Sequence, residues 1–266
     1  MKKYKLIVTM IIAVGVILIG TSNPISNIYK STNFISKFKL DNDNKDKKEN
    51  NKSQNENYII CIDPGHQQKG DPTPEPIGPG SPYKKARVSS GATGVATKKP
   101  EYILNLEASI VLKNILENKG YTVIMTRETH DVNISNSERA TLANENKANM
   151  VIRVHADSLD NSGKTGASLL VPQQNGKYTS GIYKPSNECA ILIKEELEKS
   201  GIQVNGIFER DDLTGFNWST VPVVLVEMGF LSNYNEDQMM SNPEYQRKLM
   251  ESISNGLDEY FINKWI

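Results

Sequence analysis

Three strand-like segments of this chain end on side chains that can bind a metal ion or move a proton. An apolar run from Tyr58 to Ile62 gives way to Asp-Pro-Gly and then to His66. Two further apolar runs end on His155 and on Glu227. Continuous apolar runs are typical of strands buried on both faces, as in a parallel sheet covered by helices. Because ligands bind at the carboxyl ends of such strands, we expect the three side chains to share one site.

Histidine nitrogen and carboxylate oxygen are ligands that zinc prefers, and a catalytic zinc site adds an open position for water to three protein ligands. The chain has only three histidines. His66 and His155 each end an apolar run, whereas His130 falls in a polar loop, where we expect it to be solvated. Two strand-end histidines near carboxylates indicate a zinc site. The alternative, that each is a structural residue, stays open on the residue types alone.

The composition excludes several other functions. Lys plus Arg and Asp plus Glu number 31 each, and the basic residues are scattered, so nothing indicates a nucleic-acid partner. The only cysteines are Cys61 and Cys189, which rules out a CxxC metal or redox motif. Cys61 lies inside the first apolar run, where a small buried hydrophobe is a better interpretation than a disulfide partner.

The N-terminal part of the chain has the features of a targeting segment followed by a linker. Residues 1–20 combine a basic start with an apolar run over residues 6–20, which suits a signal-peptide core and is short for a membrane span. No Ala-x-Ala cleavage site follows, so the segment is either a signal peptide or an N-terminal membrane anchor. Residues 21–57 are predicted to be a disordered polar linker, because residues 41–52 contain no apolar side chain. We therefore expect export to the cell envelope, either secreted or tethered.

Residues 58–266 alternate strand and helix patterns, which predicts an α/β fold: a three-layer α/β/α single domain with a mainly parallel sheet flanked by helices. After the first strand we expect a helix from Glu101 to Lys119 and a helix that holds Arg139. Further strands are expected at 121–126, 150–155, 167–171 and 221–227, and further helices at 187–200 and 243–261.

The segment 67–99 is rich in Gly, Pro and Lys. Its sequences Asp-Pro-Thr-Pro-Glu-Pro and Gly-Pro-Gly predict an absence of regular structure. A loop of this length beside a candidate site is usually functional or a lid, and the alternative is a tolerated surface insertion.

Several motifs, taken in order, resemble the zinc-dependent N-acetylmuramoyl-L-alanine amidases, which are cell-wall hydrolases with an α/β catalytic domain. Each motif alone is weak, but the ordered set covers nearly all of the domain. The motifs are Asp63-Pro64-Gly65-His66, Glu101 with Leu104-Asn105-Leu106, Met125-Thr126-Arg127, Arg139-Ala140 with Ala143-Asn144, Arg153-Val154-His155-Ala156-Asp157, and Pro222 through Val226-Glu227-Met228-Gly229-Phe230-Leu231-Ser232-Asn233.

The resemblance implies a zinc ion held by His66, Glu101 and His155. It also implies that Glu227 is the catalytic carboxylate, which takes a proton from the zinc-activated water and passes it to the leaving amine. The alternative for Glu227 is a structural ion pair.

Glu107 competes with Glu101 as the carboxylate ligand. Glu101 is preferred because it precedes Asn105 by four residues, as in the family, and opens the helix. Glu107 is then expected on a solvated helix face or paired with Lys113. Arg139 and Asn144 are expected to orient the helix and loops and not to touch substrate.

Three features depart from the family pattern. Gln67 and Gln68 replace the usual glycine pair, the segment before Glu101 is long, and Lys98-Lys99-Pro100 precedes that residue. These departures put loop shape and substrate preference in doubt, and leave the metal site intact.

The resulting prediction is an exported zinc amidase that cleaves the amide between N-acetylmuramic acid and L-alanine of peptidoglycan. A zinc peptidase acting within the stem peptide is one alternative. A catalytically silent wall-binding module is another, and the presence of all four site residues argues against it. The expected partners are peptidoglycan and an activating or targeting protein, with the membrane reached only through the N-terminal segment.

Overall fold

The computed structural model describes residues 55 and 57–262. The expected signal peptide or anchor at 1–20, and the linker at 21–57 apart from Asn55 and Asn57, lie outside the described residues. Asn55 donates a hydrogen bond from Nδ2 to the carbonyl oxygen of Lys119 at 3.1 Å. Among the described residues, no helix combines the length and apolarity needed to cross a membrane.

A six-stranded sheet forms the centre of the fold, in the order β4-β1-β5-β8-β6-β7. Four neighbouring strands are parallel, β6 is antiparallel to β8, and β7 is parallel to β6. The expected mainly parallel sheet is therefore confirmed. The strands are β1 (Ile59–Pro64), β4 (Thr122–Met125), β5 (Met150–Asp157), β6 (Ala167–Pro172), β7 (Val204–Arg210) and β8 (Val223–Phe230).

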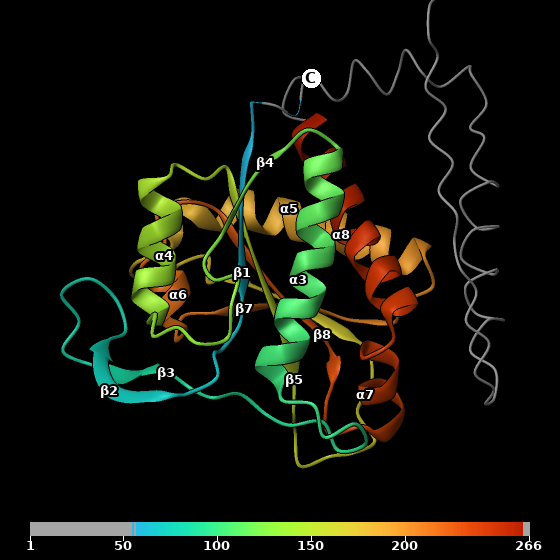
Figure 1. The fold of residues 1–266 in the computed structure, drawn as a ribbon. Helices are drawn as coiled ribbons and strands as arrows, with labels where there is room; N and C mark the ends of the chain where they lie inside the picture. The colour runs from blue at the N-terminus through green and yellow to red at the C-terminus, as the bar shows by residue number, and fades with distance from the viewer. Residues whose placement is uncertain (1–54, 56, 263–266) are drawn as a thin grey trace, which may run out of the picture. The chain divides into compact units, whose positions relative to one another are not determined.

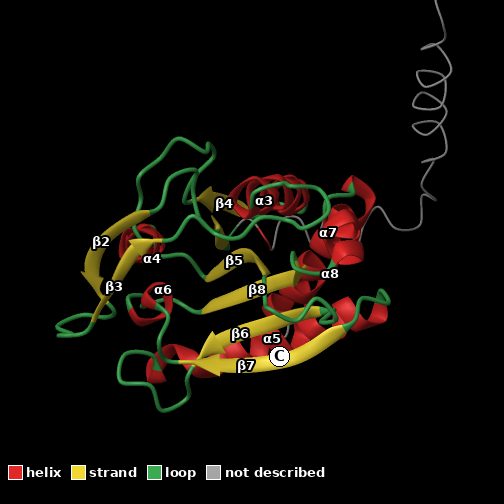
Figure 2. Ribbon diagram, turned by 90° about the horizontal axis from the view of Figure 1, so that it is seen from below, coloured by secondary structure: helices red, strands yellow, loops and turns green. Residues whose placement is uncertain are grey.

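Helices cover both faces of this sheet and complete the three layers (Figures 1 and 2). One face carries α3 (Glu101–Asn118), α5 (Ser180–Lys199) and α8 (Pro243–Ile262), with α7 (Tyr234–Met240) beside α8. The other face carries α4 (Asn136–Glu145) and the short α6 (Thr214–Asn217). The three-layer α/β/α architecture predicted from the alternating patterns is confirmed.

Two apolar clusters pack against the sheet, and they explain the two cysteines. Cys189 belongs to the larger cluster, together with Leu112 of α3 and Leu257 of α8. Cys61 belongs to the smaller cluster, together with Phe216 of α6. Both cysteines are buried and no disulfide joins them, as expected for Cys61 as a small apolar residue. Burial also raises the pKa of the Cys61 thiol to about 12.

The segment 67–99 corrects the sequence prediction. It contains a hairpin of β2 (Asp71–Pro76) and β3 (Lys84–Val88), so the expected absence of regular structure is wrong. Proline cannot donate to a ladder, but the prolines of β2 alternate along the strand. The ladder is regular from Pro74 to Pro76, so the missing N–H groups of these two prolines fall on the side away from β3, and Pro72 lies at an irregularity between Asp71 and Pro74.

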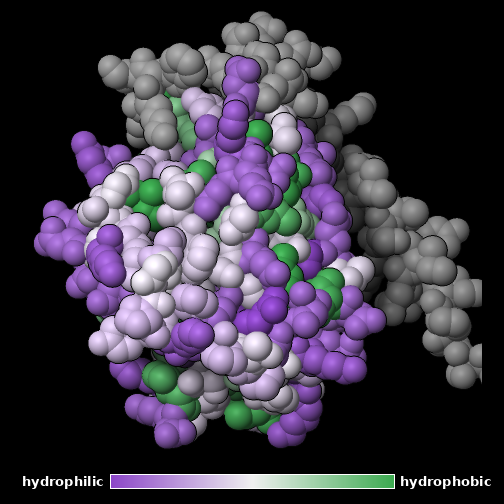
Figure 3. Space-filling view, turned by 90° about the vertical axis from the view of Figure 1, so that its left-hand side faces the viewer, coloured by the Kyte–Doolittle hydropathy of each residue, from purple (hydrophilic) through white to green (hydrophobic). Residues whose placement is uncertain are grey.

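The hairpin is fixed to the body of the domain. Arg87 of β3 pairs with Glu138 of α4 at 2.8 Å, and Trp218 donates from Nε1 to the carbonyl oxygen of Pro76 at 2.9 Å. Lys85 pairs with Asp212 at 2.9 Å. Figure 3 shows the face that carries the hairpin and α4 as mostly hydrophilic, with scattered apolar side chains. The hairpin therefore forms a fixed wall, in place of the free lid that the composition suggested.

Other differences are smaller. The helix expected at 187–200 begins at Ser180 and contains Pro185. The sequence analysis missed β7, α6 and α7. β7 is an edge strand with polar residues and a glycine, and α6 and α7 are short and mostly polar, so none shows a clear apolar period.

Candidate metal and catalytic site

His66, Glu101 and His155 come together at one end of the parallel strands. β1 and β5 pair so that Pro64 lies beside Val154, which brings the residues that follow β1 next to His155. Glu101 is the first residue of α3. Its Oε1 atom lies 3.0 Å from Nε2 of His66 and 3.3 Å from Nδ1 of His155. One ligand atom from each residue lies within 4.8 Å of the others.

The carboxylate of Glu101 is held in place by polar hydrogens. The backbone N–H of Ala92 donates to Oε2 at 2.9 Å, and Asn105 Nδ2 donates to Oε1 at 3.1 Å. The N–H of Ala156 also donates to Oε1, at 3.3 Å. Burial alone would raise the pKa of Glu101, but hydrogen bonds from His155 and His66 lower it well below its usual value. The site therefore holds an ionised carboxylate.

Both histidines suit a role as nitrogen ligands. Nδ1 of His66 lies 3.0 Å from the carbonyl oxygen and from Oγ of Ser89, which fixes the ring. Burial lowers the pKa of His155 to about 4, so its ring is neutral. The Nε2 atom of His155 is buried and has no hydrogen-bond partner among the described residues. Two imidazoles, one carboxylate and an unsatisfied buried nitrogen fit a metal ion such as zinc.

Two glycines allow this close packing. A side chain at Gly65 would collide with the ring of His155. A Cβ atom at Gly91 would lie 2.7 Å from Oε2 of Glu101 and 2.9 Å from the ring of His66, and its φ of +80° also favours glycine. The backbone therefore approaches the ligand side chains from two directions.

Glu227 lies next to this group. It faces His155 directly in the register of β5 and β8 and lines a cleft of about 270 Å³ with both histidines. Its Oε2 atom is buried and accepts no hydrogen bond among the described residues. Burial, and then the charges of Glu101 and Asp157, raise the pKa of Glu227 well above its usual value. A buried carboxyl group with a raised pKa and a free oxygen has a higher proton affinity than an ordinary glutamate, which suits a group that takes up a proton and passes it on during a reaction.

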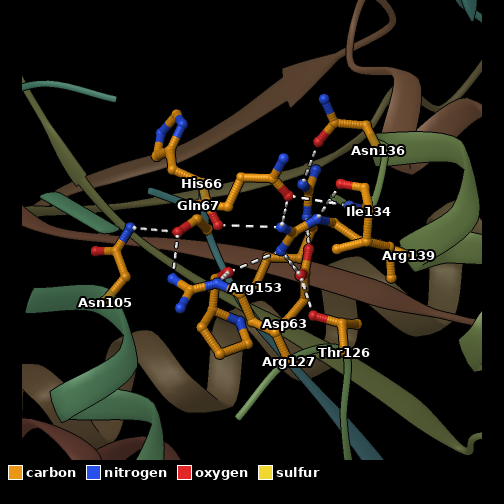
Figure 4. Close-up of polar contacts among 12 residues, drawn as sticks. Asp63, His66, Gln67, Asn105, Thr126, Arg127, Ile134, Asn136, Arg139 and Arg153 are labelled. Atoms are coloured by element: carbon orange, nitrogen blue, oxygen red, sulfur yellow. Dashed lines mark hydrogen bonds and ion pairs between the residues drawn. The ribbon is translucent and has the colours of Figure 1, made fainter. Parts of the chain in front are cut away.

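A buried ionic network supports the turn that carries His66 (Figure 4). Asp63 Oδ1 accepts from Thr126 Oγ1 at 2.6 Å and from Arg139 Nη1 at 2.7 Å, and its Oδ2 accepts from Arg153 Nε at 2.7 Å. Burial would raise the pKa of Asp63, but Arg139 and Arg153 lower it far below its usual value. Asp63 therefore stays ionised and anchors two arginines from α4 and β5.

Arg139 and a third arginine, Arg127, also hold the backbone of the turn. Arg139 donates to the carbonyl oxygens of Pro64 at 2.8 Å and of His66 at 3.0 Å. Arg127 donates to the carbonyl oxygens of Pro64 at 3.0 Å and of Gly65 at 2.9 Å. His66 has a φ of +60°, which is uncommon outside glycine. The clamped carbonyls sustain this conformation, and the ring of His66 points away from the network (Figure 4).

Other residues singled out in the sequence fall outside the His-Glu-His group. Arg139 holds the turn, and Asn144 bonds the carbonyl oxygen of Trp218 and the N–H of Thr220, so both orient backbone as expected. Glu107 pairs with Lys99 at 2.5 Å on the surface of α3. Its expected pairing with Lys113 is wrong, because that lysine reaches Glu128 at 2.8 Å.

His130 is also placed differently from the prediction. It is only partly exposed, and its ring contacts Tyr102 edge to face, with 5.2 Å between ring centroids. Burial, followed by the charge of Arg127, lowers its pKa. The expectation of a solvated residue is therefore wrong, because the polar loop folds back over α3.

The sequence analysis missed residues that position the site from the side of the long segment. Asp237 of α7 accepts from the N–H groups of Ala96 and Thr97 at 2.7 and 2.8 Å, which fixes the turn before Glu101. Ser89 and Ala92 bond His66 and Glu101 directly. An acidic residue in the first turn of a short helix was the only available signal for Asp237.

Comparisons with known proteins agree with the geometry. A family model described as N-acetylmuramoyl-L-alanine amidase matches residues 60–259. The chain is 26% identical over 210 residues to an N-acetylmuramoyl-L-alanine amidase of Mycobacterium tuberculosis, covering 75% of this chain and 84% of that protein. The crystal structure of the amidase Ami1 from Mycobacterium smegmatis superposes with a TM-score of 0.69, at 25% identity, covering 78% of this chain and 98% of that one.

The fold is also shared with the CwlD amidase of Clostridioides difficile, whose structure is a complex with the GerS lipoprotein. That match has a TM-score of 0.62 at 24% identity, and it covers 78% of this chain and 100% of that one. The family predicted from the motifs is confirmed: the chain belongs to the N-acetylmuramoyl-L-alanine amidase family.

Proposed function

We propose that this protein hydrolyses the amide between the lactyl group of N-acetylmuramic acid and L-alanine in peptidoglycan, with a zinc ion held by His66, Glu101 and His155. The observation that carries the proposal is the grouping of these three side chains around Oε1 of Glu101, in a chain of the amidase family. Family membership supports the reaction class, and the donor set supports the metal.

Each side chain then has a defined task. A zinc ion at this position would supply Lewis acidity, activating water and polarising the scissile carbonyl. Glu227, beside His155 and unsatisfied at Oε2, would accept the proton of the attacking water. It would then deliver that proton to the nitrogen of L-alanine as the C–N bond breaks. The products are a lactyl carboxylate and a free amine.

Hydrogen bonds around the ligands keep their atoms in fixed positions. The N–H groups of Ala92 and Ala156 orient the carboxylate of Glu101, and Ser89 orients the ring of His66. Such supporting contacts typically change metal affinity by about 10- to 100-fold. Asp63 and the arginines around it act one step further out, by holding the backbone of His66.

The location and partners follow from the substrate. Peptidoglycan lies outside the cytoplasmic membrane, so the protein would act in the cell envelope after export. Export through residues 1–20 as a signal peptide or anchor, and tethering through 21–57, remain predictions for a part of the chain outside the described residues. The complex of the Clostridioides difficile amidase with a lipoprotein supports an activating or targeting protein as a partner.

The test is to measure bound zinc in the purified full-length chain by elemental analysis and to digest purified peptidoglycan with it. Glu101→Ala is compared with Glu107→Ala, which removes a carboxylate from the exposed face of the same helix. We expect about one zinc per chain in wild type and Glu107→Ala, and a strong loss in Glu101→Ala. Mass spectrometry should find released peptides that begin with L-alanine.

The alternatives predict other products. Peptides cut within the stem would identify a zinc peptidase. Zinc binding without any product, on walls of several compositions and with candidate partners supplied, would contradict the amidase proposal. Loss of neither zinc nor products in Glu101→Ala would contradict the assigned ligand set.

A further inference from the structure

The cleft that contains Glu227 has a second end with a different chemistry. His66, His155 and Glu227 line one end of it. It is also lined by Lys85 of the hairpin, by Arg210 at the end of β7 and by Asp212 just after that strand. The apolar side chains of Leu170 and Leu225 contribute to the lining between these groups.

The sheet register gives the separation of the two ends. Leu170 of β6 pairs with Leu225 of β8, two residues before Glu227. β6 runs antiparallel to β8, so the step from Leu170 to Pro172 leads away from Glu227. Pro172 pairs with Arg210 of β7. Arg210 therefore lies about four positions along the strands and two strands across from Glu227. At ~3.3 Å per residue and ~4.8 Å per strand, their Cα positions are about 16 Å apart. An extended peptide would cover this length with two to three residues, once the reach of the arginine side chain is included.

The distal end carries two cationic side chains that pair with the same carboxylate. Arg210 Nε and Nη2 donate to the two carboxylate oxygens of Asp212 at 2.8 and 3.0 Å. Lys85 donates to Oδ2 of the same residue at 2.9 Å and to its carbonyl oxygen at 2.7 Å. Two cations thus share one anion. Hydrogen bonds from Arg210, then from Lys85, lower the pKa of Asp212 far below its usual value, so this anion is ionised. The charges of Glu227 and Asp211 also act on Arg210.

Arg210 has donors left for a ligand. Guanidinium carries five N–H donors, and Asp212 uses those of Nε and one on Nη2. The Nη1 atom makes no hydrogen bond within the described part of the chain, and 40% of the side chain is exposed. Asp212 holds the guanidinium plane in a fixed orientation, which is the arrangement that favours recognition of a second carboxylate.

We propose that Arg210, oriented by Asp212, binds a free carboxylate on the second or third residue of the stem peptide. The enzyme would therefore prefer stem peptides whose carboxyl group is free over those in which it is amidated. This inference rests on the proposed amidase function, because it places the peptide side of the scissile amide in this cleft.

The charge decides which side of the substrate lies here. The hydroxyl and acetamido oxygens of the glycan could accept hydrogen bonds from an arginine, but these neutral groups do not match its positive charge. A carboxylate on an extended peptide matches both the charge and the distance. The alternative is that Arg210 and Asp212 only fix the hairpin through Lys85. That role would affect stability and all substrates alike, so substrate discrimination separates the two.

The test uses synthetic N-acetylmuramoyl tripeptides with L-alanine first, in pairs that differ only by a carboxylate or its isosteric carboxamide. One pair carries the change at the second residue, and the other at the third. kcat/KM is measured for wild type, Arg210→Gln and Arg210→Lys with the full-length chain. Arg247→Gln is the matched control, since this exposed arginine lies on α8, across the sheet. Calorimetry with the free tripeptides measures binding independently of turnover.

We expect wild type and Arg247→Gln to prefer the carboxylate in one of the two pairs by about 10- to 100-fold. Arg210→Gln should reduce this ratio to below about 2-fold by weakening only the carboxylate substrate, and Arg210→Lys should retain part of it. Calorimetry should show the same loss of binding. Equal hydrolysis of both members of each pair by wild type, or an unchanged ratio in Arg210→Gln, would overturn the inference. Absence of hydrolysis in wild type for every substrate would instead contradict the proposed function.

Discussion

Asp63 and Glu227 are two carboxylates from strands on either side of β5, and they show how surroundings separate a structural role from a reactive one. The oxygens of Asp63 receive hydrogen bonds from Thr126 and from two arginines. Oε2 of Glu227 receives none within the described residues. Arginines lower the pKa of Asp63 against its burial, whereas burial and nearby carboxylates raise the pKa of Glu227.

Both carboxylates are buried, so burial does not distinguish them. They differ in how many hydrogen bonds their oxygens accept. A carboxylate whose oxygens are all bonded has no capacity left for a reacting proton. It can still fix charged neighbours, as Asp63 fixes Arg139 and Arg153. A buried oxygen without a partner costs stability, and such groups concentrate where they serve a reaction. Replacing each carboxylate by its isosteric amide should therefore affect different properties. The change at Glu227 should lower activity, and the change at Asp63 should lower stability.

Glu227→Gln should have the largest effect on activity. The amide cannot accept the proton of the attacking water, so kcat should fall by about 10²- to 10⁴-fold. Zinc content should be unchanged, and the free energy of unfolding should stay within about 1 kcal/mol of wild type. Peptide release from peptidoglycan, elemental analysis and urea unfolding measure the three quantities. A loss of zinc equal to the loss of activity would make Glu227 a ligand and would break the comparison.

Asp63→Asn should have the largest effect on stability. Replacing one partner of a buried ion pair leaves Arg139 and Arg153 without their anion, which typically costs about 3–5 kcal/mol. Since the pKa of Asp63 is depressed in the folded chain, its contribution is present at neutral pH and is lost as the pH falls below the unfolded value of about 3.9. Urea unfolding at pH 7 measures the loss.

Asp160→Asn, at an exposed loop position, is the control for Asp63→Asn and should change stability by less than about 0.5 kcal/mol. If Asp63→Asn were as stable as this control, the other hydrogen bonds of Arg139 and Arg153 would be enough to hold them. The structural half of the comparison would then fail.

Gly65→Ala should lower both zinc affinity and stability, because Gly65 lies between the ring of His155 and the arginines that surround Asp63. The added methyl group would collide with the ring of His155, while the carbonyl oxygen of Gly65 is held by Arg127. The ring must shift, so zinc affinity should fall by about 10- to 100-fold, and overpacking should cost about 1–3 kcal/mol of stability. Competition with a chelator measures the affinity. Gly181→Ala lies in α5, where a Cβ atom meets open space, so it should leave zinc affinity unchanged and raise stability by no more than about 1 kcal/mol.

The sequence predicts the part of this arrangement that depends on strand ends. The apolar runs of β1, β5 and β8 fix three parallel strands, and parallel strands share one carboxyl edge, so the proximity of His66 to His155 follows. The position of Glu101 came from the motif resemblance. The roles of these residues in zinc binding and of Glu227 in catalysis remain predictions.

The supporting residues could not be predicted in the same way. Arg127 and Arg139 act through side chains that reach backbone carbonyls far away in sequence, and no periodic pattern encodes that direction. The hairpin of β2 and β3 is stabilised by distant partners such as Trp218, which outweigh the low strand propensity of its prolines. Short-range sequence patterns therefore predict neither the arginine contacts nor the hairpin.

Tyr121→Phe should have the smallest effect of these substitutions. It tests whether burial and a nearby carboxylate also shift the pKa of a group far from the site, here a hydroxyl that donates a hydrogen bond. Tyr121 donates from its hydroxyl to Oδ1 of Asp258 at 2.8 Å, and its removal should cost about 1–2 kcal/mol at pH 7. Burial, and then the charge of Asp258, raise the pKa of Tyr121. Its contribution is therefore complete below the unfolded pKa of about 10 and declines by about 1.4 kcal/mol per pH unit above it.

The gap in unfolding free energy between wild type and Tyr121→Phe should therefore close between pH 10 and pH 11 in urea titrations. Tyr234→Phe, at a side chain with 61% of its surface exposed, should show no such change with pH. A gap that stayed constant to pH 11 would mean that the hydroxyl of Tyr121 ionises equally in the folded and unfolded chains. Burial beside a carboxylate would then have no influence on proton affinity in this fold, and the contrast drawn between Asp63 and Glu227 would lose its physical basis.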